Sequence, residues 1–69
     1  MEKPATIEGI RRYTIHGEAY AVVYFSHDGD RDTFQQAQLS DDALPVNLRV
    51  GDTVAITFVG SIVAGIRLG

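Results

Sequence analysis

The acidic side chains of one polar segment have the spacing that opens a calcium-binding loop. Asp28, Asp30 and Asp32 follow a D-x-D-x-D pattern, and alternating carboxylates are common ligands of Ca²⁺. The same loop requires Gly at its sixth position and a bidentate Glu at its twelfth. Thr33 and Leu39 occupy these positions here. We therefore predict a solvated loop between two strands and no metal site.

The other residue types that could do chemistry are scattered along the chain. His16 and His27 fall in separate turn regions of a chain without Cys, and their spacing is not that of a metal site. Ser26, Ser40 and Ser61 fall in predicted turns or caps, and none lies in a G-x-S-x-G pattern that would expose a nucleophile. We expect a protein that is not an enzyme and that carries no cofactor.

Length and composition restrict the class of protein. The 69 residues are enough for one domain, which we place at residues 5–69 after a disordered tail at residues 1–4. No apolar run approaches the roughly 20 residues of a membrane helix, and the first residues do not form a signal peptide. We expect a cytoplasmic protein that does not enter a membrane. The net charge of −3 does not favour nucleic-acid binding, because neutralisation of phosphates normally contributes much of the affinity. Five of the six basic residues are Arg, however, and they can still cluster locally.

Alternating and β-branched stretches predict an all-β domain with one short helical turn. The predicted elements are strands at residues 5–15, 19–25 and 33–39, a helical turn at 40–45, and strands at 53–59 and from 62 onward. Gly9 falls inside the first strand, where glycine often marks a bulge, and a bulge would bring Ile7 and Ile10 to the same side. Ser40 is a candidate cap of the helical turn, and Pro45 ends it.

The last hairpin has two possible registers. Gly60 and Ser61 fit a two-residue turn with glycine first, which pairs Val59 with Ile62 and leaves both faces of the hairpin apolar. A loop one residue longer would place Ile62 and Ile66 on the same face as the core-facing side chains of the strand at residues 53–59. Because side chains alternate with a period of two, one residue decides between these faces.

The order β-β-β-short helix-β-β is that of the OB-fold, a five-stranded, partly open barrel. The segment LRVGDTVAI (residues 48–56) follows QLSD (residues 38–41), and this text resembles the S1-type RNA-binding domains of that fold. Residues 6–10 resemble their opening strand. The resemblance implies a barrel that binds its ligand over the second and third strands, beside the first and last hairpin loops. The alternative is an SH3-like barrel.

Two tyrosines are candidates for that ligand surface. If Phe25 pairs with Phe34, both side chains lie inside, and Tyr20, Tyr24 and Gln35 point outward, because an exposed Tyr keeps its hydroxyl in water.

Outward tyrosines beside Arg11 or Arg12 would form a stacking platform for the bases of single-stranded RNA or DNA. Together with Tyr20, Tyr24 and Gln35, these arginines make up the predicted nucleic-acid-binding site. The alternative interpretation is ordinary cross-strand packing of tyrosines on a solvated face.

A second function class is a protein-interaction or assembly module. Ile62, Ala64 and Ile66 would form an exposed apolar edge in the last hairpin, and an open strand edge can pair with another chain. This hypothesis predicts a protein partner or a homodimer. The two functions are compatible with each other.

Overall fold

The structure is a computed structural model that describes residues 2–68, with the backbone alone for Arg31. It is an all-β protein with five strands, as the sequence predicts, and these strands form a single antiparallel sheet. Its elements are β1 (Glu2–Ile15), β2 (Glu18–His27), β3 (Asp30–Ser40), a short 3₁₀ turn η1 (Asp41–Ala43), β4 (Thr53–Val59) and β5 (Ile62–Leu68).

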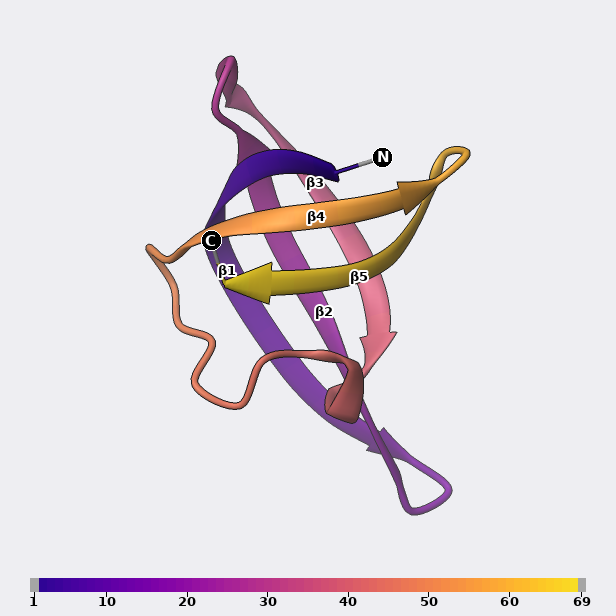
Figure 1. The fold of residues 1–69 in the computed structure, drawn as a ribbon. Helices are drawn as coiled ribbons and strands as arrows, with labels where there is room; N and C mark the ends of the chain where they lie inside the picture. The colour runs from indigo at the N-terminus through magenta and orange to yellow at the C-terminus, as the bar shows by residue number, and fades with distance from the viewer. Residues whose placement is uncertain (1, 69) are drawn as a thin grey trace.

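The sheet has the strand order β3-β2-β1-β4-β5, with β1 at its centre. Residues 2–6 of β1 pair with β4, and β1 pairs with β2 from Ala5 to its end. The sheet coils so that β4 and β5 cross in front of β2 and β3 (Figure 1). Within residues 2–68 no ladder joins β3 to β5, so the sheet is open between its two edge strands.

Gly9 marks a bulge in β1, as predicted. The pairing with β2 shifts between Ile7 and Gly9, which leaves Glu8 without a partner residue in β2. Ile7 then pairs with Phe25 and Ile10 with Val23. Ile7 is buried and Ile10 packs against the core from the same side. A bulge bends a strand, and this one separates the part of β1 that pairs with β4 from most of the part that pairs with β2.

The last hairpin uses both registers that the sequence left open. Gly60 has a φ of 64°, and beside the turn Val59 pairs with Ile62 and Phe58 with Val63. A shift between Thr57 and Phe58 then leaves Ala64 as an extra residue, and Ile56 pairs with Ile66. The bulge therefore brings Phe58, Val63, Ile56 and Ile66 to the core, while Val59 and Ile62 stay exposed.

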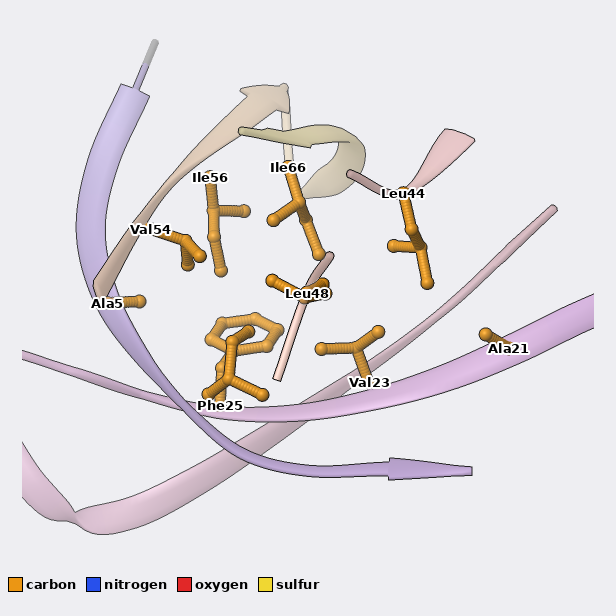
Figure 2. Close-up of a cluster of buried hydrophobic side chains, with 10 residues drawn as sticks. Ala5, Ala21, Val23, Phe25, Leu44, Leu48, Val54, Ile56 and Ile66 are labelled. Atoms are coloured by element: carbon orange, nitrogen blue, oxygen red, sulfur yellow. The ribbon is translucent and has the colours of Figure 1, made fainter. Parts of the chain in front are cut away.

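The core lies between the two halves of the coiled sheet. Its buried hydrophobic side chains are Ala5, Ile7, Ala21, Val23, Phe25, Leu44, Leu48, Val54, Ile56 and Ile66. Two of them, Leu44 and Leu48, come from the connection between η1 and β4 and not from a strand. Figure 2 shows Leu48 in the middle of the cluster, between Ile66 of β5 and the side chains of β2. The connection therefore helps to cover the core of a sheet that does not close.

The turn before β4 joins this connection to β1. Gly51 has a φ of 95°, its N–H donates to the carbonyl of Ile7 over 2.8 Å, and the N–H of Ile7 donates to the carbonyl of Asp52 over 3.0 Å. The Asp52 carboxylate accepts the N–H of Arg49 at 2.9 Å. Gly51 and Asp52 thus form the turn into β4, and residues 48–52 of the LRVGDTVAI segment have a structural role.

Two local predictions differ from the structure. Glu2, Lys3 and Pro4 were predicted to lie in a disordered tail, but they form the start of β1 and pair with β4. Pro4 is tolerated because β1 pairs with a single neighbour there, so the missing N–H can face away from the ladder. Ser40 makes no side-chain hydrogen bond to η1, so the predicted cap is wrong. Met1, the rest of the predicted tail, lies outside the described residues.

Candidate functional site

The side of β1, β2 and β3 that faces away from the core carries most of the aromatic side chains. Ala21, Val23 and Phe25 are buried, so the alternation of β2 sends Tyr20 and Tyr24 to the opposite face. Both tyrosines are half-buried there. The outward direction predicted for them is therefore confirmed.

Tyr20 forms a stacked pair with Tyr13 of β1. His16 and Gly17 both have positive φ (52° and 82°), as in a type I′ turn. This two-residue turn sets Tyr13 opposite Tyr20, and the ring centroids lie 5.9 Å apart with an interplanar angle of 25°. Tyr13 was not among the predicted site residues. The turn contained the signal, because a two-residue loop at His16 and Gly17 fixes this pairing.

The hydroxyl of Tyr20 donates a hydrogen bond to Glu18 Oε2 at 2.7 Å. This bond raises the pKa of Tyr20 above its ordinary value of 10.0, because the carboxylate favours the protonated phenol, with a smaller contribution from desolvation. The Tyr20 ring is thus held in a defined orientation and remains neutral.

Tyr24 lies over Gly9. A Cβ atom at Gly9 would stand 3.4 Å from Tyr24 Cδ2, so the glycine leaves room for the ring to lie close to the backbone of β1. A shallow hollow of about 410 Å³ lies beside it, lined by Arg11, Tyr13, Val22, Tyr24 and Gln36. The hollow joins two rings, one cation and one amide side chain on a single surface.

The predicted register between β2 and β3 is wrong by one residue. Phe25 pairs with Gln35, and Ser26 pairs with Phe34. Near the turn the pairing shifts to His27 with Asp30, so residues 31–33 are extra residues in β3. Phe34 therefore lies on the outward face, 62% exposed, and Gln35 lies on the inner side opposite Phe25. Both assignments are the reverse of the prediction.

The two predicted arginines point to different sides of β1. Arg11 pairs with Val22 and lines the hollow beside Tyr24. Arg12 Nε donates to Asp41 Oδ1 at 3.0 Å, on the side of the sheet where η1 lies. No ion pair of Arg11 is present among the described residues. The structure thus brings together Arg11, Tyr20 and Tyr24 of the predicted set, but neither Arg12 nor Gln35.

We call this outward surface the aromatic face. It consists of Arg11, Tyr13, Tyr20, Val22, Tyr24, Phe34 and Gln36. Phe34 and Gln36 could not be assigned to it from the sequence, because their placement depends on the irregular register of β3.

The predicted protein interface is only partly exposed. Ile62 is 71% exposed and Ala64 is also exposed, but Ile66 is buried at 7%. The prediction that Ile66 belongs to an exposed edge is wrong, because the bulge at Ala64 turns its side chain to the core. Val59, 68% exposed, pairs with Ile62 and makes the end of the hairpin apolar.

We also searched residues 2–68 for a metal site. In this part of the chain, no group of three or more His, Asp or Glu side chains could hold a metal ion.

Comparisons with protein-family models, with curated proteins and with solved structures found no match to this chain. A search of residues 2–68 for a helix with the length and apolar character to cross a membrane found none.

Proposed function

We propose that this protein binds single-stranded RNA or DNA through the aromatic face and catalyses no reaction. The observation that carries the proposal is the stacked pair of Tyr13 and Tyr20 on the same face as Tyr24, Phe34 and Arg11. Stacking of a base on an exposed ring contributes about 1–3 kcal/mol and tolerates any base.

The charge of the face indicates how such binding would work. Arg11 is the one cation among the described side chains of this face, and the whole chain has a net charge of −3. Phosphate contacts make binding depend on salt: for single strands, the slope of log K against log salt concentration is about −0.7 per contacted phosphate. Binding through this face would therefore be weak and largely independent of sequence, with stacking as its main source of free energy. The amide of Gln36 offers a further hydrogen bond to a base or phosphate.

We also propose that the fold is an OB-like open barrel, with an SH3-like barrel as the alternative. The support is the order of the strands, the short η1 turn between β3 and β4, and the leucines of the following connection that fill the core. We further propose a cytoplasmic location, as expected from the sequence.

The test is an NMR titration of the labelled protein with short single-stranded RNA and DNA at low salt. We expect shift changes over β1, β2 and β3 at the aromatic face, and a salt slope of about −0.7. Phe34→Ala should weaken binding about tenfold through lost stacking. The exposed Val59→Ala is the matched control, and Arg49→Gln is the control for Arg11→Gln. Unchanged affinity in Phe34→Ala and in a Tyr20→Ala/Tyr24→Ala double variant would show that the face is not the binding site.

A second candidate function is association through the last hairpin. Val59 and Ile62 form an exposed apolar pair at its end, and β5 is an edge strand of the sheet. An exposed apolar edge can pair with a second copy or another protein. Light scattering over a range of concentrations tests self-association, and Ile62→Lys should abolish it because a charged edge resists pairing. A protein that stays monomeric at high concentration removes the homodimer.

A further inference from the structure

A second hollow lies on the opposite side of the sheet from the aromatic face. It has a volume of about 450 Å³ and is lined by Lys3, His27, Gln35, Phe58, Gly60 and Ser61. These residues come from the start of β1, the end of β2, β3 and the β4–β5 hairpin. Figure 1 shows these segments toward the upper end of the molecule. We call this hollow the mouth pocket.

His27 lines this pocket and contains a buried polar atom without a hydrogen-bond partner among the described residues. Its ring packs against Phe25 with centroids 5.5 Å apart and against Phe58 at 6.0 Å. Its Nδ1 atom is buried and has no hydrogen-bond partner among the described residues. Buried polar atoms are nearly always paired, so one without a partner calls for a group that the structure does not contain. A ligand in the mouth pocket can supply that group.

The lining of the mouth pocket favours an anion with a flat ring. Lys3, the one lysine of the sequence, places Nζ 5.9 Å from the centroid of the Phe58 ring. Gln35 and Ser61 add an amide and a hydroxyl that can donate hydrogen bonds. Among the residues that the structure describes, the lining contains no carboxylate, although the chain as a whole is acidic. Asp28 and Asp30 line a different hollow, of about 350 Å³, on which Lys3 and His27 also border.

We propose that the mouth pocket binds a phosphorylated nucleotide, with the phosphate at Lys3 and the base against Phe58. The adjacent cation and apolar wall match the two parts of such a ligand, and the volume is within the range of small-molecule sites. The preference for a nucleotide over another aromatic anion rests on the proposed function. The ligand can be a free mononucleotide or the phosphorylated end of a bound strand.

The test is an NMR titration with adenosine monophosphate, with adenosine as the ligand control. We expect shifts at the amides of Gln35, Gly60 and Ser61 and at the imidazole of His27, and about tenfold weaker binding of adenosine. Lys3→Gln should weaken the monophosphate about tenfold, while Arg49→Gln, with the same loss of charge elsewhere, should not. His27→Phe keeps an aromatic ring between Phe25 and Phe58 and should weaken binding through the loss of Nδ1.

Oligonucleotides with and without a terminal phosphate separate the two sources of the ligand. Pocket shifts with a phosphorylated strand, but none with the monophosphate, would assign the pocket to the end of a strand. If neither the monophosphate nor a phosphorylated strand moves the pocket resonances, the inference is wrong. Shifts on the aromatic face alone would show that the mouth pocket binds no nucleotide and would leave the proposed function intact. Shifts in the mouth pocket alone would support the pocket and would contradict nucleic-acid binding by the aromatic face.

Discussion

Arg67 and Glu2 tie the last strand to the first strand across β4. Arg67 Nε donates to Glu2 Oε2 at 2.6 Å and Nη2 donates to Oε1 at 2.8 Å, which is a two-pronged contact between residues 65 positions apart. Such forked pairs are geometrically specific. The hydrogen bond from Arg67 lowers the pKa of Glu2 below 4.5, and the same bond raises the pKa of Arg67.

The lowered pKa of Glu2 predicts a dependence of stability on acid. A carboxyl group with a lower pKa in the folded state adds stability that is complete above its unfolded pKa and is lost as the pH falls through the folded value. We therefore expect the urea midpoint of the native protein to fall more steeply below pH 4.5 than that of Glu2→Gln. Asp42→Asn, which removes an exposed carboxyl elsewhere in the protein, is the control for the loss of one negative charge. Parallel profiles for the native protein and Glu2→Gln would contradict the prediction.

Ser26 should be more important for stability than its size implies. It is fully buried, and its hydroxyl donates to Glu8 Oε2 at 2.5 Å, at the bulge of β1. Ser26→Ala removes the donor to a partly buried carboxylate, and we expect a loss of about 1–3 kcal/mol in the free energy of unfolding. Chemical denaturation of Ser26→Ala, Glu8→Gln and the double variant measures the coupling. Strictly additive losses would show that the bond does not stabilise the bulge.

A substitution at Gly51 should lower the stability of the protein because of the backbone conformation alone. A Cβ atom at Gly51 would meet nothing within 4 Å, but its φ of 95° is one that other residues rarely adopt. We expect Gly51→Ala to lower stability by about 1–3 kcal/mol. Gly29→Ala is the matched control, since its Cβ also points into open space and its φ lies outside that region. Equal thermal midpoints for the two variants would contradict this explanation.

Leu48 should behave as a core residue although it lies outside the strands. It is 5% exposed, whereas its neighbour Val50 is 63% exposed. Leu48→Ala should cost about 2–5 kcal/mol, the usual range for a buried leucine. Val50→Ala should change stability by less than about 0.5 kcal/mol. Denaturation curves of the two variants give the comparison, and a small loss for Leu48→Ala would mean that the connection does not seal the core.

Local patterns in the sequence were sufficient for most of the fold. Turn residues and alternation located all five strands, and Gly9 located the bulge in β1. Tyr20 and Tyr24 were assigned to the outward face because a hydroxyl favours water over the core. These predictions depend on short-range chemistry, which a single sequence contains.

The errors arose where an irregular pairing changes which face a side chain occupies. Residues 31–33 offset β3 against β2, so Phe34 and Gln35 exchanged faces. The bulge at Ala64 similarly turned Ile66 inward. Residues 31–33 contain no glycine or proline. Gly65 stands directly beside the extra Ala64, as Gly9 stands beside Glu8, but it was not interpreted as a bulge signal. The start of β1 was missed for another reason, because its partner β4 lies some fifty residues later in the chain.

That distant pairing has a consequence for synthesis of the chain. Residues 2–6 leave the ribosome before their ladder partner in β4, which lies some fifty residues later in the chain. Contacts between such distant segments form slowly, because the entropic cost of closing a long loop must be met before the contacts stabilise the chain. The hairpin of β1 and β2 can form early, but the β4-facing hydrogen-bonding groups at the start of β1 stay in water until β4 is available. We expect a nascent chain that ends before β4 to expose Ala5 and Ile7, and the final hairpin to complete folding as a single late step.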